Sequence, residues 1–261
     1  MPYFLIHHKD VQYHGENPTI LYGYGGFEIS LTPYYQGITG SCWLSQSFPS
    51  NSRHACYVIA NIRGGGEYGP FWHKSALKEK RQNAYDDFIA IAEDLIQRKI
   101  TSVKNLAIKG GSNGGLLMGN MIVQRPDLFG AVHCEVPLLD MKEYNKLLAG
   151  ASWMAEYGNP DTEDWDNFLK KYSPYHHIIP NETEGNKSIV YPPLIMTTST
   201  KDDRVHPYHA RCFVKRLKNG GKVDKSIGIH RGDVVYYENI EGGHGVSNSS
   251  VLFSLFYHIL V

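Results

Sequence analysis

A serine, a pair of aspartates and a histidine stand at three widely separated places in the 261-residue chain, each in a glycine-rich or turn-like context. Ser112 is the central residue of a G-x-S-x-G pattern at 110–114. Asp202 and Asp203 follow an apolar run, and His244 has a glycine on either side. A hydroxyl, a carboxylate and an imidazole in this chain order are the groups that nucleophilic catalysis by serine requires.

Each group needs the others to do chemistry. A serine hydroxyl is a weak nucleophile at neutral pH, so a base such as His244 must take its proton. A buried carboxylate then orients the imidazole and stabilises its charged form. Either aspartate can serve, because the other can cap the helix predicted at 209–218.

Structural alternatives exist for the serine and the histidine. The glycine-rich turn at Ser112 could hold a phosphate at a helix N-terminus, but the chain has neither a P-loop lysine nor a G-x-G-x-x-G pattern. His244 could be a core residue, although a histidine between two glycines has few neighbours to pack against.

Strands and helices that alternate along the chain must position these groups. Apolar runs predict strands at 3–8, 19–22, 55–61, 105–109, 131–136, 192–198 and 233–238. Helical spacing of apolar residues predicts helices at 84–98, 116–125, 209–218 and 250–259. This alternation predicts an α/β fold, with a mostly parallel sheet and helices on both faces, in one domain over residues 1–261. The serine, the aspartates and the histidine each follow a strand, so they should meet at one edge of the sheet.

Composition excludes several other classes of protein. Twenty-six basic and 26 acidic residues cancel, which argues against nucleic acid or an anionic membrane as a partner. No apolar run approaches the roughly 18 residues of a membrane-spanning helix. The histidines and the four cysteines show no metal-ligand spacing, so we expect neither a metal nor a cofactor.

The turn at 22–27 carries two tyrosines and three glycines directly after a predicted strand. Such a turn can be a packing device, or it can present a donor to an oxyanion. Position alone does not decide between the two. The backbone N–H of Asn113 is the expected first oxyanion donor, because it follows the nucleophile.

Six segments together resemble the peptidase domain of prolyl oligopeptidases, and the resemblance runs from about Tyr3 to the C-terminus. The segments are Tyr22-Gly-Tyr-Gly-Gly-Phe27, Asn61-Ile-Arg-Gly-Gly-Gly-Glu-Tyr-Gly69, Gly110-Gly-Ser-Asn-Gly-Gly115, Arg125-Pro-Asp-Leu-Phe-Gly130, Asp202-Asp-Arg-Val205 and Gly243-His-Gly245. The resemblance implies an α/β-hydrolase fold. It assigns Ser112 as nucleophile, Asp202 as the orienting acid and His244 as base, with Tyr24 and Asn113 as oxyanion donors.

The same resemblance implies a pocket for a substrate proline. Trp153 and Tyr157 match the aromatic residues that enclose the proline ring, and Arg204 matches a residue that holds a substrate carbonyl. Without the family, core packing is the simpler explanation of the two aromatic residues. The implied pocket residues are Phe27, Leu138, Trp153, Tyr157, Arg204 and Val205.

The expected function is therefore hydrolysis of short peptides on the carboxyl side of proline, through an acyl-enzyme and without a cofactor. The alternatives are an esterase, an acylaminoacyl- or dipeptidyl-peptidase-like hydrolase, and an inactive remnant or interaction module.

Family members carry a β-propeller that is absent from this chain, so the chain is expected to be an excised domain or a truncated product. The segment 181–189 looks longer than its counterpart in the family. We expect a cytoplasmic location, or a periplasmic one should a signal segment precede the chain.

Overall fold

The computed structural model describes residues 1–46, 53–178, 190–219 and 233–245. Within these ranges all the strands join one seven-stranded sheet, in the order β1-β3-β2-β4-β5-β6-β7, and none of them forms a propeller blade. The strands are β1 (Tyr3–His7), β2 (Thr19–Tyr22), β3 (Cys56–Ala60), β4 (Leu106–Gly111), β5 (Ala131–Glu135), β6 (Leu194–Ser199) and β7 (Val234–Asn239).

Strand direction confirms the prediction of a mostly parallel sheet. Only β1 runs antiparallel to its neighbour, with Tyr3 opposite Ala60 of β3. All the other pairs are parallel. The carboxyl ends of β4, β5 and β6 therefore lie at the same edge, with β5 between the other two. Neighbouring strands are about 4.8 Å apart, so loops that leave β4 and β6 start roughly 10 Å from each other.

The longer helices begin and end close to the predicted bounds, and several short ones were not predicted. The α-helices are α1 (Gly37–Thr39), α2 (Pro70–Lys74), α3 (Gln82–Gln97), α4 (Asn113–Gln124), α5 (Met154–Tyr157), α6 (Asp164–Asn167), α7 (Pro174–His177) and α8 (Tyr208–Asn219). A π-helix, η1 (Gly40–Leu44), continues α1. Short stretches of 3-10 helix form η2 (Lys78–Lys80), η3 (Val103–Asn105), η4 (Tyr144–Lys146), η5 (Leu148–Trp153) and η6 (Leu169–Tyr172).

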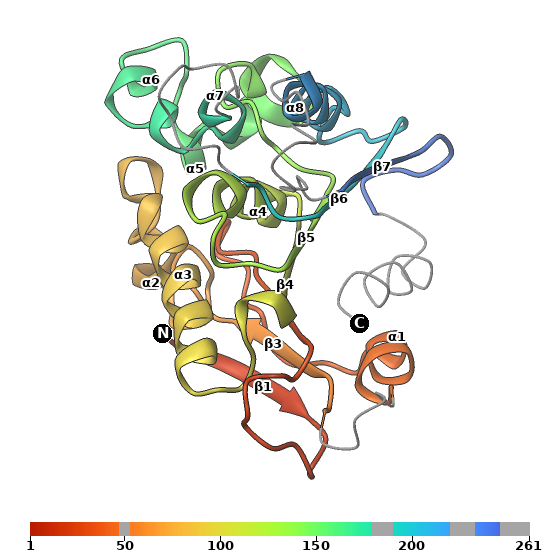
Figure 1. Cartoon of the computed structure of the whole chain (residues 1–261). Helices are drawn as coiled ribbons and strands as arrows, with labels where there is room; N and C mark the ends of the chain where they lie inside the picture. The colour runs from red at the N-terminus through yellow and green to blue at the C-terminus, as the bar shows by residue number, and fades with distance from the viewer. Residues whose placement is uncertain (47–52, 179–189, 220–232, 246–261) are drawn as a thin grey trace, which may run out of the picture.

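Two apolar clusters cover opposite faces of the sheet, because successive side chains of a strand point to opposite sides. Leu21 and Ile108 belong to the larger cluster, which also holds the buried side of α3 and α4. Ile20 and Ala107, their neighbours in sequence, belong to a smaller cluster with Trp43 of η1. Helices α2 and α3 accordingly lie on the other side of the strands from α1 (Figure 1). The helices cover both faces, as the sequence predicted.

The segment between β5 and β6 is built from short helical elements and has no long helix in the part that the structure describes. These elements are η4, η5, α5, α6, η6 and α7. Gly158, which has a φ of 101°, ends α5. The predicted helix at 250–259 and the predicted longer loop at 181–189 lie outside the described residues.

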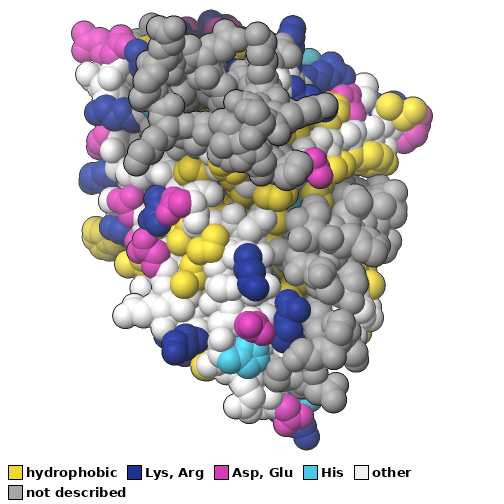
Figure 2. All heavy atoms as spheres, in the orientation of Figure 1, with side chains coloured by type: hydrophobic (Ala, Val, Ile, Leu, Met, Phe, Trp, Pro, Cys, Tyr) yellow, Lys and Arg dark blue, Asp and Glu magenta, His cyan; other side chains and the backbone are white. Residues whose placement is uncertain are grey.

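The described surface mixes charges of both signs. On the face seen in Figure 2, basic and acidic side chains lie next to one another along one flank instead of gathering into a patch of one sign. In the ranges that the structure describes, no helix combines the length and the apolar character needed to cross a bilayer. Those ranges also contain no group of three or more His, Cys, Asp or Glu side chains placed to hold a metal ion.

Candidate active site

Ser112 lies at a sharp turn between β4 and α4. Its φ of 57° and ψ of −114° put a residue with a side chain in the left-handed region, which is strained backbone. The Ser112 N–H donates to the carbonyl of Glu135 at the end of β5 (2.9 Å), and the Ser112 carbonyl accepts the N–H of Leu116 (3.1 Å). Bonds to strand on one side and helix on the other hold the serine at the edge of the sheet.

Close backbone contacts explain why glycine occupies positions 110 and 114, the two ends of the G-x-S-x-G pattern. A Cβ atom added to Gly110 would lie 2.5 Å from the carbonyl oxygen of Gly114, and one added to Gly114 would lie 2.6 Å from that of Gly23. Backbone atoms cannot move aside as flexible side chains can. The turn therefore brings the end of β4, the start of α4 and the loop after β2 into direct contact.

The structure brings Asp202 and His244 together. Nδ1 of His244 lies 2.8 Å from Oδ2 and 3.0 Å from Oδ1 of Asp202. Oδ1 of Asp202 also accepts the backbone N–H groups of Arg204 and Val205, both at 2.9 Å. The Asp202 side chain is buried, whereas the side chain of His244 is partly exposed. An imidazole held through Nδ1 leaves Nε2 as the nitrogen that can take a proton from a nucleophile.

Asp202 is ionised at neutral pH. Burial raises the pKa of Asp202, but the hydrogen bonds from His244, Val205 and Arg204 outweigh burial and bring this pKa below its usual value of 3.8. Asp203, its neighbour in sequence, is exposed. The two aspartates, which the residue pattern alone does not distinguish, thus lie in different surroundings.

Tyr24 lies beside Ser112 in the turn after β2. Its side chain is close enough to that of Ser112 for Ser112 to act on the pKa of Tyr24, which it lowers. Burial is the main reason that the pKa of Tyr24 lies above 10, so the phenol keeps its proton at neutral pH. The carbonyl of Tyr24 accepts Nδ2 of Asn113 at 2.6 Å, which ties this turn to the first residue of α4.

The residues expected to form a proline pocket have unequal access to solvent. Phe27 and Trp153 are partly exposed, and Arg204 is exposed. Tyr157 exposes 0% of its surface: its hydroxyl donates to Oδ1 of Asn113 (2.8 Å), and its ring meets that of Phe27 edge-on with centroids 5.6 Å apart. Leu138 and Val205 are also buried. In this structure Tyr157 therefore lies behind Phe27 and not on the open surface.

Two charged residues near the site were not identified from sequence. Arg81 and Glu156 are 1% and 5% exposed, and Nη1 of Arg81 donates to Oε1 of Glu156 at 2.8 Å. The available signal was a single glutamate inside the aromatic segment 153–157. Its partner lies 75 residues earlier in the chain, so the sequence alone does not pair them.

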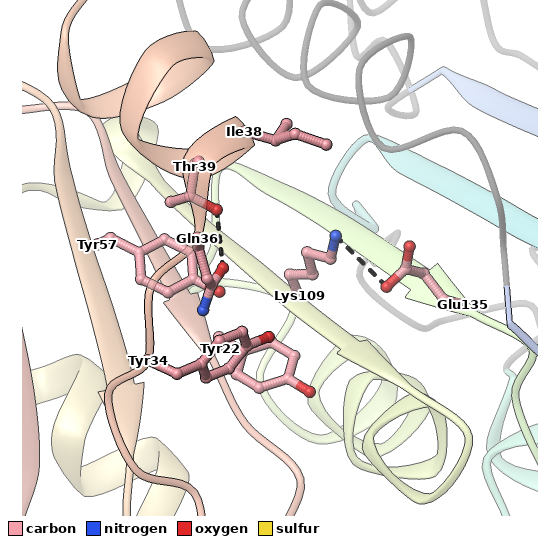
Figure 3. A pocket seen from close by; sticks show the side chains of 9 residues that line it. Tyr22, Tyr34, Gln36, Ile38, Thr39, Tyr57, Lys109 and Glu135 are labelled. Atoms are coloured by element: carbon pink, nitrogen blue, oxygen red, sulfur yellow. Dashed lines mark hydrogen bonds and ion pairs between the residues drawn. The ribbon is translucent and has the colours of Figure 1, made fainter.

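A separate pocket of about 360 Å³ lies on the sheet face that carries Trp43. Tyr22, Tyr57 and Tyr34 contribute to its wall, and Nζ of Lys109 pairs with Oε2 of Glu135 at 3.5 Å (Figure 3). None of the residues predicted for the site lines this pocket.

Comparison with known proteins identifies relatives of the chain. The model of the prolyl oligopeptidase family matches residues 43–250. An uncharacterised peptidase, y4nA, of Sinorhizobium fredii is 48% identical over 247 residues, which cover 95% of this chain and 31% of the relative. A prolyl endopeptidase of Dictyostelium discoideum is 39% identical over 230 residues, which cover 87% of this chain and 29% of the relative.

Solved structures agree with the sequence relatives. A post-proline cleaving enzyme from Rickettsia typhi matches 99% of this chain with a TM-score of 0.83 and 42% identity, and 34% of that enzyme is covered. A structure from a study of two prolyl endopeptidases matches 99% of this chain with a TM-score of 0.86 and 40% identity, and 36% of it is covered. The chain thus spans about a third of the length of the relatives that it matches.

Proposed function

Because the chain belongs to the prolyl oligopeptidase family, we propose that it is a serine peptidase which cleaves short peptides on the carboxyl side of proline. The observation that supports this most strongly is the Asp202–His244 pair at the edge where Ser112 turns into α4. The family relation supplies the proline preference, since two relatives are named as prolyl endopeptidase and post-proline cleaving enzyme.

In the proposed first step Ser112 attacks the scissile carbonyl. Nε2 of His244 takes the proton from the serine hydroxyl as the bond from Oγ to the carbonyl carbon forms. Asp202 holds the Nδ1–H tautomer and stabilises the imidazolium, because its carboxylate is ionised and already bonded to Nδ1. The strained turn at Ser112 is the kind of strand-to-helix turn that exposes Oγ in hydrolases with a G-x-S-x-G pattern.

The negative charge then develops on the former carbonyl oxygen. We assign the Tyr24 hydroxyl and the backbone N–H of Asn113 as its donors. Collapse of the tetrahedral intermediate breaks the C–N bond, and the imidazolium of His244 gives its proton to the departing amine. Water, deprotonated by His244, then attacks the carbonyl carbon of the acyl-enzyme. The bond from this carbon to Oγ of Ser112 breaks, His244 returns the proton to Oγ, and the peptide acid leaves.

The proline ring of the substrate would lie between the partly exposed rings of Phe27 and Trp153. A flat aromatic surface suits a rigid apolar ring, because contact area is gained at little cost in conformational entropy. Tyr157 would support Phe27 from behind, and Leu138 and Val205 would form the apolar base. Arg204, exposed beside Asp202, would bind a carbonyl oxygen of the substrate.

Labelling with a fluorophosphonate tests the nucleophile, and a pair of chromogenic amides tests the specificity. We expect wild type to be labelled, Ser112→Ala to remain unlabelled, and a Gly-Pro amide to be hydrolysed faster than a Gly-Ala amide. Failure of folded wild type to label would contradict the enzymatic function. Labelling with no preference for proline would leave a serine hydrolase and remove the prolyl specificity.

A further inference from the structure

The turn that carries Tyr24 is strained and must be held in place. Phe27 and Glu28, which have side chains, adopt φ of 55° and 57° in succession. Such backbone persists where the surrounding structure overdetermines it. Backbone contacts hold the far side of the turn, where the N–H of Glu28 donates to the carbonyl of Gly64 (3.2 Å).

The carboxylate of Glu156 holds the near side. Its Oε1 accepts the N–H of Phe27 at 3.0 Å and Nη1 of Arg81 at 2.8 Å. Its Oε2 lies 2.7 Å from Nε2 of His73. A buried carboxylate with three partners in fixed directions is a strong anchor, because its contacts are charge-assisted and the one with Arg81 is fully buried.

Arg81 extends this anchor to the helix that follows Ser112. Its Nη2 donates to Oδ1 of Asn113, and its guanidinium lies over the ring of Tyr157 at 5.2 Å. Gly26 packs directly on this contact, since an added Cβ would lie 2.6 Å from Nδ2 of Asn113 and 2.9 Å from Nη2 of Arg81. One buried ion pair therefore spans both oxyanion donors, the turn of Tyr24 and the start of α4.

We propose that Arg81 and Glu156 are positioning residues that lock the Tyr24 turn against Asn113, so that both oxyanion donors are in place before substrate binds. The inference rests on the proposed function, because it assigns Tyr24 and Asn113 to the oxyanion. Neither charge touches the reacting atoms, so the pair acts through Tyr24. Arg81 and Glu156 act on the pKa of Tyr24 in opposite directions, Arg81 lowering it and Glu156 raising it, so the proposal depends on where the pair holds the turn.

A double-mutant cycle between Glu156 and Tyr24 tests the coupling in the full chain. Glu156→Gln keeps the shape of the side chain and removes its charge. We expect kcat for the Gly-Pro amide to fall about tenfold with KM within about twofold of wild type. In a Tyr24→Phe background the same change should cost less than about twofold. Equal losses in both backgrounds would overturn the proposal.

A second variant separates positioning from stability. Glu156→Gln alone leaves the buried Arg81 without its counter-ion, whereas Arg81→Met/Glu156→Met removes both charges at similar volume. We expect the urea midpoint of the double variant to return close to that of wild type while kcat remains at least about tenfold low. If kcat recovered together with the urea midpoint, the pair would contribute to stability only and the proposal would be wrong.

A matched control and a readout without catalysis complete the test. Leu31 lies further along the loop that carries Tyr24, and its N–H donates to the carboxylate of Glu67 at 2.9 Å. Glu67→Gln should therefore leave kcat within about twofold of the wild-type value. Hydrogen exchange at the Phe27 amide should accelerate at least about tenfold in the double methionine variant, and unchanged exchange would overturn the proposal. Should wild type show no turnover, the proposed function fails, and the exchange experiment still decides whether the pair holds the turn.

Discussion

The Nδ1 atom of His244 lies 2.8 Å from Oδ2 of Asp202, and the same carboxylate accepts the N–H groups of Arg204 and Val205. Three donors converge on one buried side chain from two loops that follow β6 and β7. This arrangement holds the carboxylate ionised and rigid in front of the imidazole. Asp203 has no such surroundings, because its side chain is exposed.

Exchanging each aspartate for asparagine is therefore expected to give unequal results. Asp202→Asn should lower kcat about 10⁴-fold, as loss of the orienting carboxylate does in other serine peptidases, because the imidazole loses its correct tautomer. Asp203→Asn should stay within about twofold. Steady-state kinetics on the Gly-Pro amide measures both. A larger loss in Asp203→Asn would mean that the wrong carboxylate has been assigned.

Tyr24→Phe tests the second oxyanion donor. The variant removes one hydroxyl beside Ser112 and keeps the ring, so the turn should stay packed. We expect kcat to fall by about 10²–10³-fold with little change in KM, because the donor acts on charge that develops in the transition state. Unchanged kcat would assign the oxyanion to other donors.

Local pattern was sufficient to predict the sheet and the turn at Ser112. Apolar runs that alternate between strand and helix spacing indicate which residues are buried. Glycines on both sides of a serine indicate that backbone segments approach each other closely. The helix at α1 and η1 was missed, since Gly37 and Gly40 lower its helical propensity and the packing of Trp43 on the sheet overrides them.

Long-range pairing explains what the sequence left open. The choice between Asp202 and Asp203 depended on where His244 returns to the sheet, which no local pattern encodes. The anchor formed by Arg81 and Glu156 joins residues 75 positions apart, and a charge alone does not reveal that it is buried. The catalytic and pocket roles of the named residues stay predictions.

Two neighbouring glycines offer a matched test of the turn. A Cβ on Gly110 would lie 2.5 Å and 2.9 Å from two backbone oxygens, whereas one on Gly111 meets only ordinary contacts of 3.5 Å or more. Gly110→Ala should lower the free energy of unfolding by about 3 kcal/mol or more and abolish turnover. Gly111→Ala should stay within about 1 kcal/mol of wild type. Urea denaturation compares them, and equal effects would contradict the close approach.

His209 is expected to make the fold sensitive to acid. It is buried and neutral, and its Nδ1 accepts the N–H groups of Asp140 (3.2 Å) and Leu139 (3.4 Å). Burial, reinforced by His206, lowers the pKa of His209 to about 3. Because the folded-state pKa lies below the usual 6.5, this contribution to stability is complete above pH 6.5 and is lost as the pH falls towards 3.

The measurement is the free energy of unfolding between pH 6.5 and 5, where few carboxylates titrate. One proton taken up on unfolding gives a slope approaching about 1.4 kcal/mol per pH unit. His209→Gln keeps an acceptor for both N–H groups and cannot be protonated, so its slope should be shallower by about one proton. An identical slope in the two proteins would show that another group is responsible.

Trp153→Ala tests where the specificity for proline resides. Trp153 ends η5 with its ring partly exposed, and the N–H of Ala149 in the same turn donates to the carbonyl of Arg204 (3.3 Å), which ties η5 to the loop of Asp202. A ring that stacks on proline contributes about 1 kcal/mol beyond its buried area. We therefore expect kcat/KM for a Gly-Pro amide to fall at least about tenfold, and that for a Gly-Ala amide to change by less than about threefold. Equal losses on the two substrates would mean that Trp153 stabilises the site and does not recognise proline. Phe27→Ala, measured on the same two substrates, would then test whether Phe27 is the ring that proline contacts.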